Sequence, residues 1–187
     1  FGEDNTIVGG HFSETQEVLF EILKLYPEEI WLKITKYIGP PIDIRAYNLK
    51  NWLRGGEFLN PKEGALTYIP PKEIFEWVDT DIENRAWYIA TFVPNKLFRS
   101  EDKICLAREV LLRYGEREDV QQNLYANFDT EGWSGPASSH YYQKKISLSE
   151  FKKEEDNINV IRWIDKYISD LERGIERSKI KEERRGF

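Results

Sequence analysis

The amino-acid sequence predicts an all-α fold of stacked helical hairpins, a fragment of an α-solenoid of the HEAT or armadillo kind with one long irregular loop near residues 55–71. Apolar residues recur at helical spacing along most of the 187 residues, and no two segments offer strands that could pair. Similar helix–turn–helix layouts also return at roughly 40-residue intervals. Because one helical hairpin cannot cover its own apolar face, neighbouring hairpins are expected to stack.

The first predicted element is a helical hairpin over residues 13–39 that is broken at Pro27. Ser13, with Gln16 three residues later, has the pattern of a capping box, so we expect the first helix to begin there. A Gly-Pro-Pro run at residues 39–41 then stops the second helix, since proline lacks the amide donor that a helix needs. A third helix is predicted over residues 43–54 and is closed by a glycine.

The predicted domain boundary is the segment 55–70, where glycines and prolines interrupt the helical period. We expect residues 1–54 to form an N-terminal helical hairpin region, as a divergent or capping repeat, and residues 71–187 to form HEAT-like repeats ending in a charged helix. Residues 176–185 are almost wholly charged and should fray or project into solvent. The helices expected after the loop are 71–78, 80–93, 100–114, 118–128, 135–153 and 157 onward.

The repeat signal is a short acidic turn followed, six residues after its first acid, by a polar residue in the next helix. The three copies are Asp79 with Arg85, Glu116 with Gln122, and Asp156 with Arg162. In the HEAT inter-helix turn, which the first and last copies resemble, the acid caps the second helix and the arginine pairs with an acid nearby. The alternative is an irregular helical bundle in which two hairpins happen to look alike.

Composition and charge exclude several classes of function. With 33 acidic and 27 basic residues the net charge is -6, so no chain-wide electrostatic grip on nucleic acid is expected. No apolar run is long enough for a membrane span, and the start lacks the pattern of a secretion signal. One cysteine, Cys105, fits a reducing compartment, and we expect a cytoplasmic protein in which it packs as a small buried hydrophobe. Since the chain begins at Phe1 and contains no methionine, we expect a piece of a longer protein.

Small, aromatic and titratable residues gather in the segment 129–140. Trp133 offers a flat apolar face, and His140 carries an imidazole. The spacing matches no Gly-x-Ser-x-Gly nucleophile elbow, and two histidines with one cysteine give no metal-ligand spacing. We therefore predict no catalytic residue, no metal and no cofactor. The segment is either a partner contact or a helix connection in which Trp133 plugs a gap, Ser134 caps and Pro136 takes the first helical position.

From about residue 71 to 187 the chain resembles the C-terminal HEAT-like helical-repeat tail of large multi-domain bacterial defence proteins of the STAND type. The resemblance rests on Trp133-Ser134-Gly135-Pro136 with Ser139-His140, on Asn159-Val160-Ile161-Arg162-Trp163, and on the closing run Glu182-Glu183-Arg184-Arg185-Gly186-Phe187. It implies a sensing or assembly region with no catalytic residues to carry over.

The preferred function is thus a non-catalytic interaction or recognition scaffold, whose partner is another protein or the upstream domains of the same chain. The candidate partner-binding residues are Trp133, Ser134, His140, Arg162 and Trp163. Packing of the last helix also predicts that Trp163 is largely buried. No membrane and no nucleic-acid partner are expected.

Two other functions stay open. One is a HEAT-like alkylpurine DNA glycosylase, in which Trp87, Asp79 and Arg85, or Trp163, Asp156 and Arg162, would line a groove and stack against an extruded base. The net negative charge argues against it. The other is a homo-oligomerisation platform held by the aromatic-rich first hairpin.

Overall fold

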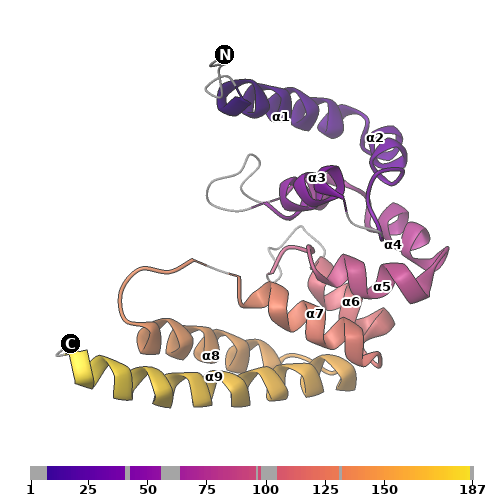
Figure 1. Ribbon diagram of the computed structural model, residues 1–187. Coiled ribbons are helices and arrows are strands. Elements are labelled where there is room, and N and C mark those ends of the chain that lie inside the picture. Colours follow the sequence, from indigo (N-terminus) through magenta and orange to yellow (C-terminus); the bar gives the residue numbers. More distant parts are fainter. Residues whose placement is uncertain are drawn as a thin grey trace. The chain divides into compact units, whose positions relative to one another are not determined.

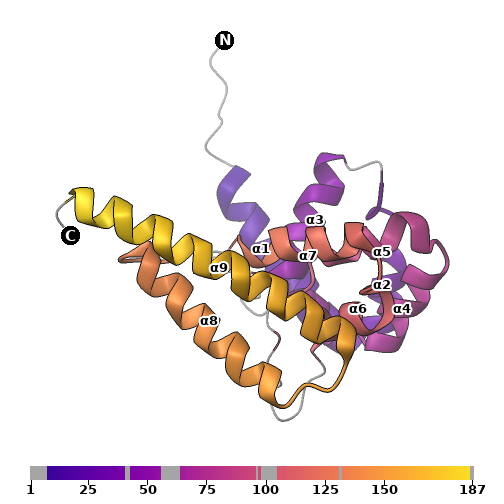
Figure 2. The same cartoon turned by 90° about the horizontal axis from the view of Figure 1, so that it is seen from below.

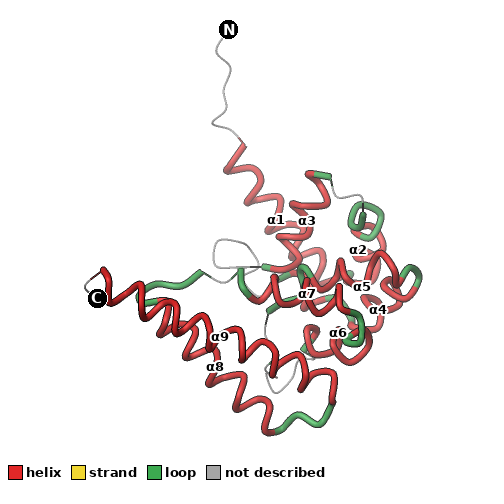
Figure 3. Tube along the Cα trace, turned by 60° about the horizontal axis from the view of Figure 1, so that its bottom comes forward, coloured by secondary structure: helices red, strands yellow, loops and turns green. Residues whose placement is uncertain are grey.

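The computed structural model describes residues 8–40, 43–55, 64–95, 97, 105–130 and 132–185 (Figure 1), with side chains from residue 16 to 184. Within these ranges every regular element is a helix and no strand occurs (Figure 3), which confirms the predicted all-α class. The chain divides into two compact units, Phe1–Pro94 and Asn95–Phe187. The division falls after Pro94, so the segment 55–70, which was expected to separate 1–54 from 71–187, lies inside the first unit.

The first unit begins with α1 (Val8–Leu25) and α2 (Pro27–Ile34). Pro27 separates them as predicted, because it starts α2 at a position where no amide donor is needed. Since α1 already runs at Val8, Ser13 lies inside the helix and the predicted capping box is wrong. On the inner side of α1, Phe20 is buried and its ring meets that of Tyr68 edge-on, with ring centroids 4.9 Å apart.

Helix α3 (Ile44–Arg54) begins and ends as predicted. The Asp43 carboxylate accepts a hydrogen bond of 2.8 Å from the Ala46 amide, and Gly55 ends the helix at a φ of 77°. A short 3-10 helix, Ala65–Tyr68, follows where a loop was expected, and it packs against α3 and α1. Gly64 allows this approach, because a Cβ there would lie 2.3 Å from the Arg54 carbonyl oxygen.

The first unit is completed by α4 (Pro71–Asp79) and α5 (Ile82–Ala90), which pack against each other. The Trp31 indole of α2 is buried and donates a hydrogen bond of 3.1 Å to the Glu73 carbonyl of α4. The same indole lies edge-on to Trp77, with centroids 5.5 Å apart. The core therefore joins α2 to α4 through two tryptophans, and the indole nitrogen of Trp31 finds its acceptor on α4.

The second unit contains α6 (Leu106–Tyr114), α7 (Glu118–Phe128), α8 (Ala137–Lys153) and α9 (Ile158–Arg185). Helices α8 and α9 form a long antiparallel pair (Figure 2), and α6 packs on both α7 and α9. One side of α9 carries an apolar seam that is buried at Val160, Ile164, Leu171 and Ile175 and half-buried at Ile168. Beyond Ile175 the helix continues to Arg185 with mostly exposed side chains, so this end projects but does not fray.

Two of the three inter-helix turns show polar contacts other than the expected acid–arginine pair. In the first copy, the Arg85 guanidinium donates to the Trp77 carbonyl at 2.8 Å and lies 4.8 Å from the centre of that indole ring. In the last copy, Asn157 instead of Asp156 caps α9, since its side-chain oxygen accepts from the amides of Asn159 and Val160. Arg162 is exposed.

Candidate functional site

The predicted segment before α8 holds a stacked aromatic pair on the surface of the second unit. Trp133 and His140 lie face to face, with ring centroids 4.9 Å apart and planes 11° from parallel. Tyr141 adds a tilted ring 5.8 Å from Trp133. The indole is 46% exposed, so Trp133 does not plug a gap between repeats, and that interpretation is wrong.

Helix α9 holds this aromatic group in place. Gly174 of α9 faces Tyr141, and a Cβ at that position would come within 3.2 Å of the tyrosine ring. Because Gly174 has no side chain, α8 can approach α9 closely beside Tyr141. Since His140 and Tyr141 are in the first turn of α8, the indole is stacked on a helix end that is itself packed.

The start of α8 is capped from a distant part of the chain. Ser134 is exposed and does not cap α8, and Pro136 lies at the N-cap position instead of the first helical position predicted for it. The Glu182 carboxylate of α9 instead accepts hydrogen bonds from the Ser138 amide at 3.0 Å and the Ser138 hydroxyl at 2.5 Å. These bonds hold the pKa of Glu182 below its usual value. The charged end of α9 thus satisfies amide donors that α8 leaves open.

Replacing Glu182 with alanine is expected to loosen the first turn of α8. Hydrogen exchange of the Ser138 to Tyr141 amides should speed up severalfold, while the buried part of α9 keeps its protection. Because the folded-state pKa is lowered, the cap is present above the ordinary glutamate pKa and is lost as the pH falls through the lowered value. The same exchange increase should appear in the unchanged chain at low pH, and Glu183→Ala, which alters an adjacent exposed acid, should leave exchange as it was.

The other two candidate residues lie at the far end of the α8–α9 pair. Ser138 meets Glu182, and Arg162 precedes Glu182 by about five and a half turns, or roughly 30 Å along the helix. Trp163 is 2% exposed, as predicted, and its indole donates to the Gln121 carbonyl at 3.1 Å. The structure therefore brings Trp133 and His140 together, places Ser134 beside them, and leaves Arg162 and Trp163 outside the site.

This burial also bears on the DNA-glycosylase hypothesis. An indole that stacks against an extruded base must present a free face to solvent. Trp163 instead packs edge-on against Phe128, with centroids 5.1 Å apart. The set of Trp163, Asp156 and Arg162 therefore does not form a base-stacking site in this conformation.

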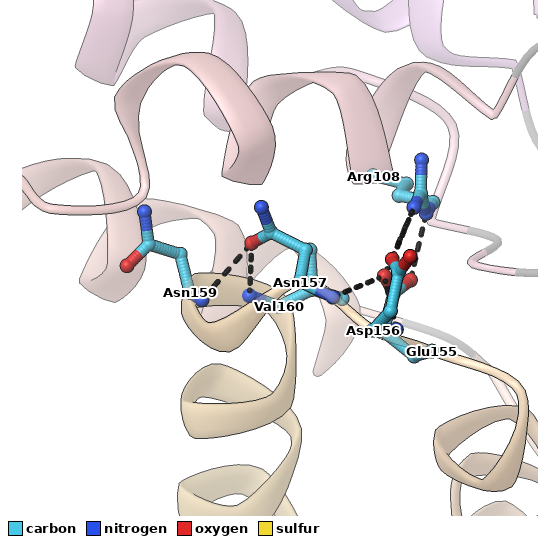
Figure 4. A network of polar contacts seen from close by, with 6 residues as sticks. All are labelled: Arg108, Glu155, Asp156, Asn157, Asn159 and Val160. Carbon is cyan, nitrogen blue, oxygen red and sulfur yellow. Dashed lines mark hydrogen bonds and ion pairs between the residues drawn. The ribbon is translucent and has the colours of Figure 1, made fainter.

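A charge cluster that sequence reasoning missed joins α6 to the turn before α9 (Figure 4). The Arg108 guanidinium holds the Glu155 carboxylate with two bonds, Nε to Oε2 at 2.7 Å and Nη2 to Oε1 at 2.9 Å. Glu155 also accepts from the amides of Asp156 and Asn157 at 3.1 and 3.0 Å. Its side chain is 1% exposed, so the carboxylate is enclosed by the groups that bond to it.

The charges of Arg108 and Glu155 stabilise each other, as the direction of both pKa shifts indicates. Burial alone would raise the pKa of Glu155, but the bonds from Arg108 and from the backbone hold that pKa below its usual value. The hydrogen bond to Glu155 raises the pKa of Arg108 in turn. Both charges are matched, and Glu155 accepts bonds from the Arg108 guanidinium and from two backbone amides of the turn. The arrangement fixes the chain between α8 and α9 instead of presenting a reactive group.

Other reactive groups give no convergent set in the part of the chain that the structure describes. Cys105 is partly exposed instead of fully buried as predicted, and burial raises the pKa of its thiol, which favours the unreactive protonated form. Among the described residues no three His, Cys, Asp or Glu side chains gather as metal ligands. No described helix combines the length and the apolar character needed to cross a bilayer.

Comparison with protein-family models, with curated proteins and with solved structures finds no match for this chain. The resemblance to bacterial helical-repeat tails therefore rests on the sequence motifs alone.

Proposed function

We propose that this chain is a non-catalytic, HEAT-like interaction scaffold, the C-terminal sensing or assembly region of a larger cytoplasmic bacterial protein. It binds another protein or the upstream domains of its own chain. The observation that carries the proposal is the exposed Trp133 indole, stacked on His140 at the packed end of α8.

Trp133 is suited to a binding contact because its side chain loses little conformational freedom when a partner binds. A large aromatic side chain contributes much of the binding energy at protein interfaces when it is already held in one conformation. Stacking on His140 supplies that restraint before any partner arrives. The neighbouring Gly132, Ser134 and Gly135 are small and exposed, so a partner can reach the indole from that side.

The helix pairs support a repeat architecture. Helices α4 and α5, α6 and α7, and α8 and α9 each follow one another in sequence and pack as pairs. Each pair buries one side, as in α5, where Ala86, Ile89 and Ala90 are buried while Ile82, Glu83 and Asn84 are exposed. Pairs of this kind leave their other edges free to contact a partner.

Affinity capture from a bacterial extract, quantified by mass spectrometry, tests the proposal. The unchanged chain should retain a specific partner, and Trp133→Ala should lower the affinity for that partner about tenfold, which corresponds to roughly 1.4 kcal/mol of binding energy. The matched control is Ile158→Ala, since Ile158 is also exposed but begins α9 at the other end of the hairpin. Equal capture by all three chains would reject Trp133 as the contact, and turnover of a small substrate by the chain alone would reject the scaffold.

A further inference from the structure

The outer face of α1 is apolar although it is exposed. Val18, Ile22 and Leu25 are spaced i, i+4 and i+7, so they share one side of the helix. Tyr26 extends this stripe by one residue, because its amide still bonds to the Ile22 carbonyl at 2.9 Å. Val18 is 61% exposed and Leu25 is 72% exposed. We call Val18, Ile22, Leu25 and Tyr26 the α1 stripe.

The described residues of the first unit leave the α1 stripe largely uncovered. The inner side of α1 is formed by Phe20 and Leu23, which are buried, and α1 packs there against α2 and the 3-10 helix. A helix with solvent on its outer side ordinarily carries polar residues there. A second apolar side at helical spacing is the pattern by which one helix binds another.

The border of the α1 stripe is acidic. Glu17 and Glu21 are exposed on α1, and Glu28 and Glu29 are exposed in the first turn of α2. The one basic residue in this stretch, Lys24, is already engaged: it pairs with Glu21 at 2.8 Å, and its ammonium lies 4.1 Å from the centre of the Phe20 ring. Lys24 therefore offsets the charge of Glu21, and the exposed carboxylates of Glu17, Glu28 and Glu29 keep the border acidic.

The negative charge at the border of the α1 stripe determines which kind of partner would fit it. A second copy of the chain would bring two acidic borders together, and like charges across a helix pair are unfavourable. A helix with an apolar stripe flanked by lysine and arginine would match both the spacing and the sign of the charge.

We propose that the α1 stripe binds a basic amphipathic helix of a partner protein. Leucine-like side chains of the partner cover Val18, Ile22 and Leu25, and its basic residues pair with Glu17, Glu21 and the carboxylates of α2. This inference rests on the proposed function only in treating the chain as a binding protein, since it uses none of the residues around Trp133.

Peptide titrations with the full chain test it. The probe is a synthetic peptide of about five helical turns with leucine at i, i+4, i+7 and i+11 and lysine on both borders. A second peptide replaces every lysine with glutamate, and a third keeps the composition but scatters the leucines around the helix. We expect binding at about 10 μM or tighter for the first peptide and at least about tenfold weaker binding for the other two. Binding of the first peptide should weaken with added salt.

Variants assign the binding to α1. Leu25→Ser with Ile22→Ser should weaken binding of the first peptide about tenfold or more, while Ile158→Ser, which changes an exposed isoleucine of the second unit, should not. Glu17→Lys with Glu21→Lys should reverse the preference toward the glutamate peptide. Circular dichroism checks that each variant keeps its helix content.

Three results would overturn the inference: no binding at roughly 100 μM, equal binding of the scattered peptide, or affinities unchanged in the α1 variants. A dimer of the unchanged chain that Leu25→Ser dissolves would also overturn it, because the stripe would then pair with a second copy. If the peptide binds but capture does not depend on Trp133, the α1 stripe is supported and the Trp133 site is rejected. If capture depends on Trp133 but the peptide does not bind, the Trp133 site is supported and the α1 stripe is rejected.

Discussion

Arg108→Met should lower the free energy of unfolding of the second unit by about 3 kcal/mol or more, measured by urea denaturation at neutral pH. The substitution keeps most of the side-chain volume but removes the guanidinium that holds Glu155 with two bonds. The carboxylate then stays in a site where its side chain is 1% exposed, without its charged partner. An unmatched buried charge costs far more than the pair contributes.

The matched control for Arg108→Met is Lys153→Met, which removes the same charge from an exposed pair with Glu150. That change should cost less than about 1 kcal/mol, because solvent screens the pair. If Arg108→Met cost no more than Lys153→Met, the network around Glu155 would not stabilise the fold.

The pH dependence of the same variant has a definite sign. In the unchanged chain the folded-state pKa of Glu155 is lowered, so its stabilisation is present above the ordinary glutamate pKa of about 4.3 and is lost as the pH falls through the lowered value. In Arg108→Met, burial without the partner raises that pKa, and protonation then relieves the penalty. The stability difference between the two chains should therefore shrink below about pH 5. A constant difference from pH 7 to 4 would mean that lost packing causes the effect.

Trp163→Ala should destabilise the second unit by about 3–5 kcal/mol. The indole is 2% exposed, packs edge-on against Phe128, and lies between α9 and α7. Its removal leaves a cavity and also deprives the Gln121 carbonyl of its donor. Thermal and urea unfolding, followed by circular dichroism, measure the loss.

Two further variants separate the parts of this effect. Trp163→Phe keeps an aromatic ring but loses the hydrogen bond to Gln121, so we expect a smaller loss of about 1–3 kcal/mol. Trp133→Ala removes an indole that is already half exposed and should cost less than about 1 kcal/mol. A loss below about 1 kcal/mol for Trp163→Ala would contradict its place in the core.

Helices were predictable where the signals are local. The helix at 118–128 has its predicted bounds, and the one predicted at 43–54 ends at the predicted glycine. Periodicity and caps act within a few residues, so a single sequence carries them. Ser13 shows the limit of such patterns: the capping motif is present, yet the helix already extends through it, since a motif only permits a start.

The candidate site was predictable only in part. The segment from Trp133 to His140 stood out by composition, and the structure stacks those two rings. Arg162 and Trp163 carried the same kind of signal, an aromatic beside polar residues, but Trp163 is buried. Exposure depends on which neighbours cover a side chain, and these come from α7, about 40 residues away in the sequence.

The amino-acid sequence by itself therefore predicts the all-α class and most helix positions, because the hydrogen bonds and the apolar spacing of a helix involve residues close in sequence. Contacts between distant residues settle the rest: the Glu182 cap on α8, the Arg108 clamp on Glu155, and the exposure of both Trp133 and the α1 stripe. Glu155 and Glu182 sit in charged runs that look like ordinary solvated surface until packing brings a donor from more than 40 residues away. Burial and pairing are properties of the packed chain, and they separate a structural carboxylate or tryptophan from one that is free to bind.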